Sequence, residues 1–228
     1  MLVIKLSKVT STQDFAEAVY QMVEEDEFVV VAEEQTKARG RYRRAWFSPK
    51  GGLWVTYVIK GFDPSKIPNL TLANALAIRE ALAKYVDAKI RWPNDVVVKD
   101  RKIAGTLVEA VVQGSEAVAF IGFGVDTNVR SFEPGLNATS VLLETGREVD
   151  NEGLLNEIIA LTKAYATKEL KELAEEANRH SSVNGRKVRL VGDGWEKACT
   201  ALFVDFLGRL VADCGIFEVE EVLRLEVI

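Results

Sequence analysis

Residues 91 to 105 read RWPNDVVVKDRKIAG, and this stretch decides how the chain folds. Short apolar segments flank a Lys99-Asp100-Arg101 turn signal, which predicts a hairpin between two strands. Lys102 follows Asp95 by seven residues, and a tight hairpin would place these two side chains on neighbouring strands. An isolated lysine–carboxylate pair on a surface contributes little. Beside Trp92-Pro93-Asn94, we interpret the pair as a site where developing charge is stabilised.

Outward from this hairpin, strands and helices mix without a regular repeat. The predicted strands cover residues 28–32, 53–59, 89–92, 95–98, 103–112 and 117–125, and the predicted helices cover 13–24, 69–86 and 150–178. The polar residues 33–49 form a long loop, and loops of this length are usually functional or disordered. Short apolar segments with glycine turns follow Ser181-Ser182. We therefore predict an α+β fold with a catalytic domain over 1–182 and a small all-β domain over 183–228.

The composition excludes several classes of protein. The chain has 228 residues, 48% hydrophobic, which is enough for a substantial core. Its formal net charge of -5 makes a nucleic-acid duplex an unexpected partner. We expect a cytoplasmic protein, because no signal peptide and no apolar run long enough to cross a bilayer is present. The only histidine, His180, lies near a predicted helix end, so a Ser-His-Asp triad is not expected.

Three further segments carry polar chemistry. Residues 10–13 read TSTQ and begin a predicted helix, where hydroxyl groups cap the helix or bind a ligand. Residues 35–46 read QTKARGRYRRAW, which combines a glycine with forked arginine donors for phosphate or carboxylate oxygens. Residues 122–128 read GFGVDTN and end a predicted strand. Each segment alone has an ordinary structural interpretation, such as a cap, a solvated loop or a polar turn.

Together with the 91–105 hairpin, in this order and at this spacing, they resemble the catalytic core of biotin protein ligases over most of residues 9–130. The resemblance implies a catalytic domain like that of class II aminoacyl-tRNA synthetases, a mixed sheet flanked by helices, with a small C-terminal β-barrel. It implies ATP and Mg²⁺ as cofactors, biotin as substrate and a biotin carboxyl carrier protein as partner, with a possible homodimer. Because about ten residues precede Ser11, we expect an archaeal-type enzyme without an N-terminal DNA-binding domain.

The resemblance also implies roles for individual residues. The implied catalytic residues are Lys102, Arg41 and Arg39. The implied biotin-binding residues are Ser11, Thr12, Gln35, Ala38, Arg41, Lys102 and Gly124. The implied nucleotide-binding residues are Arg39, Gly40, Arg44, Trp46, Asn94, Asp95, Asp126 and Asn128. Asp95 is also the implied ligand of Mg²⁺.

Three residues depart from the family pattern. Ala38 and Arg43 stand where the family usually has glycine in the arginine-rich loop, and Asp126 stands where it has the first asparagine of the strand end. A carboxylate at position 126 would repel phosphate unless a cation neutralised it. These departures leave a non-catalytic biotin or adenylate binder as one alternative. Lipoate ligases and octanoyl transferases of the same fold family are a second, and nucleic-acid binding by residues 39–44 is a third.

The two cysteines, Cys199 and Cys214, allow two interpretations. In a cytoplasmic protein two free thiols are expected. The segments 200–206 and 209–213 also read as a hairpin, and pairing of Asp205 with Gly208 would place the cysteines directly opposite each other, within disulfide reach. A one-residue bulge at Gly208 would make them diagonal instead.

Overall fold

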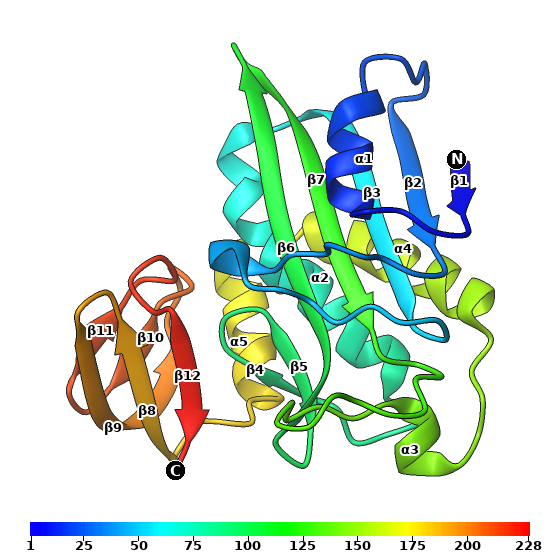
Figure 1. The fold of residues 1–228 in the computed structure, drawn as a ribbon. Helices are drawn as coiled ribbons and strands as arrows, with labels where there is room; N and C mark the ends of the chain where they lie inside the picture. Colours follow the sequence, from blue (N-terminus) through cyan, green and yellow to red (C-terminus); the bar gives the residue numbers. More distant parts are fainter.

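A seven-stranded mixed sheet forms the centre of the larger part of the molecule (Figure 1). The computed structural model describes all residues from 1 to 228. The strand order is β1-β2-β3-β7-β6-β5-β4, and only β1 and β2 run parallel. The strands are β1 Leu2–Leu6, β2 Glu27–Ala32, β3 Leu53–Phe62, β4 Lys89–Arg91, β5 Asp95–Val98, β6 Arg101–Gln113 and β7 Glu116–Val125. The predicted mixed sheet and the hairpin between β5 and β6 are therefore confirmed.

The two faces of the sheet pack against different helices, because side chains alternate along each strand. Phe28 and Val30 of β2 belong to a small core under helix α1 (Thr12–Val19). The intervening Val29 belongs to the main core, which α2 (Ile67–Leu82), α4 (Asn151–Ala166) and α5 (Leu170–Arg179) cover from the other side. Figure 1 shows α1 in front of the sheet and α2 and α4 behind it. The start of α1 is thereby placed on the face that carries the site described below.

The helix limits differ from the predicted ones at two places. Helix α1 ends at Val19 rather than at residue 24, where the acidic run 24–26 would interact unfavourably with the carbonyl end of a longer helix. The predicted helix over 150–178 is two helices, because the chain breaks after Ala166 and Glu169 begins α5 with a capping box to Glu172. A short helix, α3 (Val141–Thr145), precedes them. None of the helices combines the length and the apolar character needed to cross a bilayer.

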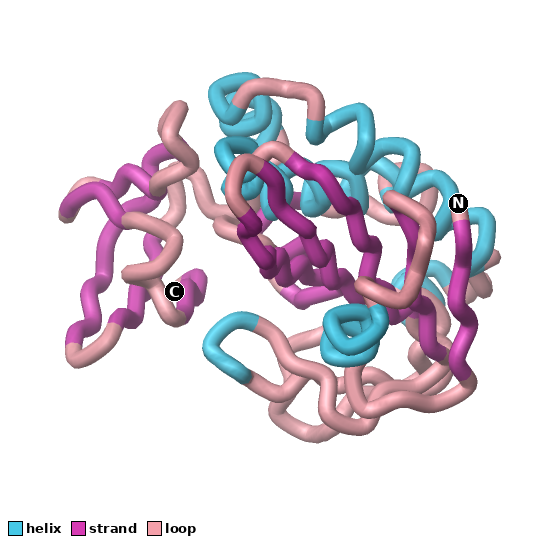
Figure 2. Tube along the Cα trace, turned by 90° about the horizontal axis from the view of Figure 1, so that it is seen from above, coloured by secondary structure: helices cyan, strands magenta, loops and turns pink.

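The C-terminal residues form an open sheet, not the predicted β-barrel. Strands β8 Lys187–Gly192, β9 Trp195–Val204, β10 Leu210–Ala212, β11 Gly215–Phe217 and β12 Arg224–Val227 are antiparallel, in the order β11-β10-β9-β8-β12. The short edge strands β11 and β12 do not pair with each other. The apolar face is covered instead by Trp92 and Ala174 of the larger part, so closure is not needed to bury it. Figure 2 shows this sheet on one side of the molecule. We propose a domain boundary between residues 182 and 183.

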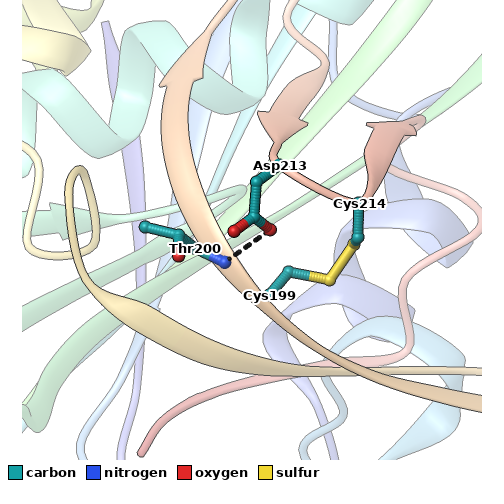
Figure 3. The surroundings of a disulfide bond; sticks show 4 residues. All are labelled: Cys199, Thr200, Asp213 and Cys214. Atoms are coloured by element: carbon teal, nitrogen blue, oxygen red, sulfur yellow. Dashed lines mark hydrogen bonds between the residues drawn. A yellow bond between two sulfur atoms is a disulfide. The ribbon is translucent and has the colours of Figure 1, made fainter.

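Cys199 and Cys214 form a disulfide, so the interpretation as free thiols is wrong (Figure 3). Their Cα atoms are 5.7 Å apart. Gly208 does form a bulge, since the Asp205 amide donates to the Arg209 carbonyl and the Gly208 amide donates to the Asp205 carbonyl. A second register shift, between Val211 and Ala212, compensates for it. Two bulges thus restore the direct opposition of the cysteines that a single bulge would have removed.

Reduction of this disulfide should destabilise the C-terminal sheet. The bridge closes a loop with a sequence separation of 15 residues, for which loop-closure entropy corresponds to about 3 kcal/mol. We expect a reductant to lower the free energy of unfolding by this amount, and therefore to lower the midpoint of denaturant unfolding. The Cys199→Ser/Cys214→Ser double variant should have the lower midpoint with or without reductant. An unchanged midpoint after reduction, verified by thiol alkylation and mass measurement, would contradict the expectation.

Candidate active site

The four polar segments converge on one cavity of about 430 Å³ above the sheet. Its walls come from the start of α1, the 35–47 loop, strands β3, β5, β6 and β7, and residues 222–226 of the C-terminal sheet. Every residue to which the sequence assigned a role lines this cavity, except Asn128. Asn128 instead exchanges two hydrogen bonds with the backbone of Val149, at 3.0 and 2.8 Å. We therefore assign Asn128 a structural role in place of the implied nucleotide contact.

One end of the cavity is lined by hydroxyl and amide groups. The Thr12 amide and hydroxyl both donate to Gln35 Oε1, at 2.7 and 3.1 Å, and Gln35 Nε2 donates to the Ser48 hydroxyl. Ser11 caps α1 by accepting from the Asp14 amide. The fully buried Thr56 of β3 donates to the Thr12 hydroxyl at 3.0 Å. Uncharged donors and acceptors held by one another suit a ligand that is polar and neutral at this end.

Trp46 and two strand glycines form the floor. A Cβ atom at Gly124 of β7 would lie 2.8 Å from Trp46 Nε1, and one at Gly105 of β6 would lie 3.1 Å from the same indole. Only glycine therefore allows the indole to lie against these strands. The Lys102 Nζ lies 4.5 Å from the centre of the Trp46 ring. The indole N–H of Trp46 is buried without an acceptor, so it is available to a bound molecule.

Charged groups meet at the centre of the cavity. Lys102 Nζ lies 2.5 Å from Asp95 Oδ1, and Arg91 Nη2 lies 2.9 Å from Asp95 Oδ2. A register shift between Val96 and Val97 of β5 turns Lys102 to the same side as Gly105. Burial opposes ionisation of Asp95, but the charges of Lys102 and Arg91 outweigh it and hold the pKa of Asp95 below its usual range. The site therefore carries an ionised carboxylate between two cations.

These contacts do not fit a Mg²⁺ ion held by the protein. Mg²⁺ is bound through carboxylate oxygens that are free to coordinate it, usually one or two together with substrate phosphates. Both oxygens of Asp95 are already engaged by cations. Two other carboxyl groups line the cavity: Asp126 is buried and has no ion pair, and Glu226 is paired with Arg224 at 3.1 Å. Asp95 therefore has no oxygen free to hold Mg²⁺.

The guanidinium groups of the arginine-rich loop point in different directions. Arg39 is held by three carboxylates, Glu109 at 2.6 Å, Asp14 at 3.1 Å and Glu17 at 3.3 Å. Arg41 reaches the C-terminal sheet, where its Nη2 donates to the carbonyls of Val219 and Val222. The two arginines therefore do not share one anion here. A ligand would have to displace Glu109 or these carbonyls to recruit either group.

Arg44 is the arginine of this loop that lines the cavity without a hydrogen bond or an ion pair from its side chain. The backbone conformation nearby shows why glycine suits one of the positions where this chain departs from the family pattern. Tyr42 and Arg43 both have a φ of 57°, in the left-handed region that favours glycine. The usual glycine at position 43 would adopt this conformation without strain. In this chain Tyr42 also donates to the Glu220 carbonyl at 3.0 Å, which helps to hold the loop in place.

A buried polar network behind the cavity was not predicted from the sequence. The Thr106 hydroxyl of β6 donates to Asn74 of α2 at 2.8 Å, and Asn74 donates to Thr162 of α4 at 3.0 Å. Asn94 donates to the Thr106 carbonyl at 2.7 Å, which fixes the Asn94 side chain at the cavity wall. The available signal was a polar residue at position 74, within the otherwise apolar run of residues 72–78. Its partners are too distant in sequence to be inferred from spacing.

Asp126 is the most isolated ionisable group of the cavity. It is 3% exposed, its Oδ1 has no hydrogen-bond partner, and no cation lies within ion-pair distance. Burial raises the pKa of Asp126 well above its usual value, and the charge of Lys102 offsets only part of this effect. An asparagine at this position would carry no such dependence on pH.

Replacement of Asp126 by asparagine should therefore stabilise the protein increasingly as the pH rises. The raised pKa means that the folded chain binds a proton more tightly than the unfolded chain. This contribution is present in full below the unfolded pKa and is lost as the pH rises through the folded pKa. We expect the melting temperature of Asp126→Asn to exceed that of the native chain by a margin that widens with pH. A constant margin across the titration would contradict a buried, titrating Asp126.

Comparisons with known proteins agree with this architecture. A family model described as the biotin/lipoate A/B protein ligase family matches residues 4–126. The bifunctional ligase/repressor BirA of Bacillus spizizenii is 31% identical over 160 residues, covering 66% of this chain and 49% of that protein. The biotin--[acetyl-CoA-carboxylase] ligase of Paracoccus denitrificans is 35% identical over 139 residues, covering 56% of this chain and 58% of that protein. The chain thus spans about half the length of the curated relatives it matches.

Solved structures resemble the whole chain. Biotin protein ligase from Aquifex aeolicus in complex with biotin and ATP superposes with a TM-score of 0.83 at 24% identity, covering 100% of this chain and 99% of that one. Biotin protein ligase from Leishmania major in complex with biotinyl-5-AMP superposes with a TM-score of 0.69 at 25% identity, covering 100% and 98%. The first likeness establishes the fold, including the C-terminal sheet. Because the family model covers more than half of the residues, the chain belongs to the biotin/lipoate A/B protein ligase family.

Proposed function

We propose that this protein is a biotin protein ligase, which activates biotin with ATP to biotinyl-5'-adenylate and transfers biotin to a lysine of a biotin carboxyl carrier protein. The observation that carries the proposal is the position of Lys102. It is paired with Asp95 above a glycine and tryptophan floor, in a cavity that Arg44 also lines. Such a place suits a carboxylate and a phosphate that must be brought together.

The neutral polar end of the cavity supports biotin as the acid. The ureido group of biotin offers one carbonyl acceptor and two N–H donors, without charge. Thr12, Gln35 and Ser48 offer both kinds of partner in a network that is already ordered. In a linear acyl chain no polar group would meet this network, which ranks lipoate and octanoate below biotin. Their exclusion is tested by competition in the assay described below.

In the first step, an oxygen of the biotin carboxylate attacks the α-phosphorus of ATP, the bond to the bridging oxygen breaks, and pyrophosphate leaves. Negative charge spreads over the phosphoryl oxygens in the transition state. The Lys102 ammonium group faces this charge from a fixed position, because Asp95 and the Trp46 ring hold it. We assign Arg44 to the phosphates, while Arg39 and Arg41 contribute only if the loop leaves its contacts with Glu109 and Val219.

In the second step, the ε-amine of the carrier lysine attacks the acyl carbon of the mixed anhydride. The new amide bond forms, AMP leaves, and the amine loses one proton. Lys102 and Arg91 engage both oxygens of Asp95, so in this step as in the first this carboxylate serves to hold Lys102 in position. As part of the same proposal we place the reaction in the cytoplasm, where ATP and carrier protein are available. A homodimer would use the outer edge of β1, which pairs on one side only.

A single-turnover assay tests the function. Labelled biotin, ATP and Mg²⁺ are mixed with the protein, and a biotin carboxyl carrier domain is added afterwards. We expect labelled adenylate first and labelled carrier second, with little competition from lipoate or octanoate. Tight biotin binding with neither product would favour the non-catalytic binder. Labelling by lipoate in place of biotin would favour a lipoate ligase.

A further inference from the structure

Residues 218–223, which join β11 to β12 and are called the connector below, hold the arginine-rich loop from outside. Arg41 Nη2 donates to the carbonyls of Val219 and Val222 in the connector. The Tyr42 hydroxyl donates to a third connector carbonyl at 3.0 Å. The loop needs such a restraint, because Tyr42 and the residue after it have a φ of 57°, which side chains other than glycine rarely adopt. The position of the loop therefore depends on where the connector lies.

The start of the connector is tied to the sheet by the disulfide. Only β11, three residues long, lies between Cys214 and the connector, and β11 pairs with β10 alone at the edge of the sheet. Phe217 of β11 adds a stacked contact with Trp195, with ring centres 5.5 Å apart. The disulfide binds Cys214 covalently to Cys199 of the ten-residue strand β9. A covalent restraint on the sheet edge is thereby passed to the carbonyls that hold the loop.

Other contacts keep the C-terminal sheet folded when this bridge is absent. Beside the disulfide, the Thr200 amide donates to the Asp213 carboxylate at 2.9 Å, and the Asp213 amide donates to the Thr200 carbonyl at 3.1 Å (Figure 3). Val222 is 1% exposed and belongs to the core of the sheet. Loss of the bridge should therefore loosen β11 and the start of the connector first, because β11 is short and is paired on one side only.

The disulfide can be reached by a reductant from one side. Cys214 is exposed, whereas Cys199 is only 5% exposed. A thiolate of a dithiol reductant attacks the Cys214 sulfur, the S–S bond breaks, and the Cys199 sulfur leaves as a thiolate and takes up a proton. The second thiol of the reductant then displaces Cys214 from the mixed disulfide. The protein gains two electrons and two protons as two thiols, and the reductant becomes a disulfide. The cytoplasm, where we place the reaction, keeps most protein thiols reduced.

We propose that the Cys199–Cys214 disulfide is a redox control on the arginine-rich loop: the oxidised bridge holds the connector, and with it Arg41 and Tyr42, whereas reduction by a dithiol releases them. One consequence rests on the proposed function, since a released loop should form the adenylate more slowly. Release of the loop itself is a property of the fold and does not depend on the substrate.

Limited digestion with trypsin tests the proposal on oxidised and reduced protein, below the melting temperature of the reduced form. Cleavage after the arginines of residues 39–44 should become about ten-fold faster on reduction, the change expected when one or two hydrogen bonds no longer restrain the loop. Cleavage after Lys187 and Arg189, which are exposed in the interior strand β8 of the same sheet, should stay nearly constant. Adenylate formation, measured by pyrophosphate exchange, should fall with release of the loop and recover on reoxidation.

Two variants complete the test. Cys199→Ser/Cys214→Ser should show the fast cleavage of the loop with or without reductant. Tyr42→Phe removes one hydrogen bond to the connector and keeps the disulfide, so it should raise loop cleavage of the oxidised protein by a smaller factor. This second variant tests the link between connector and loop even if the double variant does not fold.

The outcomes separate this proposal from that of the ligase. Unchanged loop cleavage after complete reduction, verified by thiol alkylation, would overturn the redox control. An equal rise of cleavage in β8 would also overturn it, because reduction would then unfold the sheet as a whole. A released loop with a native rate of adenylate formation would overturn the control of activity. Absence of pyrophosphate exchange in both redox states, with the expected loop response, would overturn the ligase proposal and leave the response of the loop intact.

Discussion

Replacement of Lys102 by alanine should slow biotinyl-adenylate formation by about 10²- to 10³-fold, the loss typical of removing one fixed donor that faces developing negative charge. Lys102 is the cation at the centre of the cavity, 2.5 Å from Asp95 and above the Trp46 ring. Its position is set before the ligands bind, so little reorganisation is needed during the reaction. Biotin binding itself should change less, because the neutral network at Thr12 and Gln35 is not touched by the substitution.

Two further variants separate charge from packing. Lys102→Met keeps the apolar stem beside Trp46 and removes only the ammonium group, so it should lose as much rate as the alanine variant. Lys89→Ala removes an exposed lysine of β4 in the same sheet, outside the cavity, and should retain the native rate. Adenylate formation is measured by pyrophosphate exchange, and melting curves verify that each variant is folded. A native exchange rate in Lys102→Met would remove Lys102 from the proposed mechanism.

The parts of this site that could be predicted are those that depend on residues close together in the sequence. The seven-residue interval between Asp95 and Lys102 predicted their pairing, and hairpin geometry delivers it. The register shift between Val96 and Val97 turns Lys102 toward the cavity. It could not be predicted, because the pattern of apolar residues is the same with and without it. Local strand signals also could not reveal that the C-terminal sheet stays open, because that depends on Trp92 covering its apolar face.

Contacts between distant segments were beyond the reach of sequence patterns. The resemblance placed Arg39 and Arg41 on the ligand, but their observed partners are Glu109, 70 positions away, and Val219, 178 positions away. The sequence of an arginine-rich loop shows its charge but does not show where its side chains point. The hydroxyl of Thr56 was missed for a related reason, since a threonine within a buried strand is ordinary until Thr12 is brought beside it. The sequence therefore predicts which segments meet more reliably than what each side chain touches.

The second large effect concerns Trp92, which joins the two parts of the molecule. Its side chain is 4% exposed, belongs to the core of the C-terminal sheet, and donates through Nε1 to the Gly208 carbonyl at 2.8 Å. Trp92→Ala should lower the free energy of unfolding by about 3–5 kcal/mol, the range for removing a large buried aromatic side chain. Trp92→Phe keeps part of the apolar contact and loses the hydrogen bond, so it should cost less.

This substitution should also impair the site, because the C-terminal sheet does more than pack against the larger part. Its residues 222–226 form one wall of the cavity, and its Val219 and Val222 carbonyls hold Arg41. We expect Trp92→Ala to release the arginine-rich loop and to increase cleavage by trypsin at residues 39–44. Denaturant unfolding gives the loss of stability, and limited proteolysis gives the loop response. If stability fell while the cleavage rate of the folded protein stayed native, the loop would be held by its own contacts with Glu109, and the C-terminal sheet would act on stability alone.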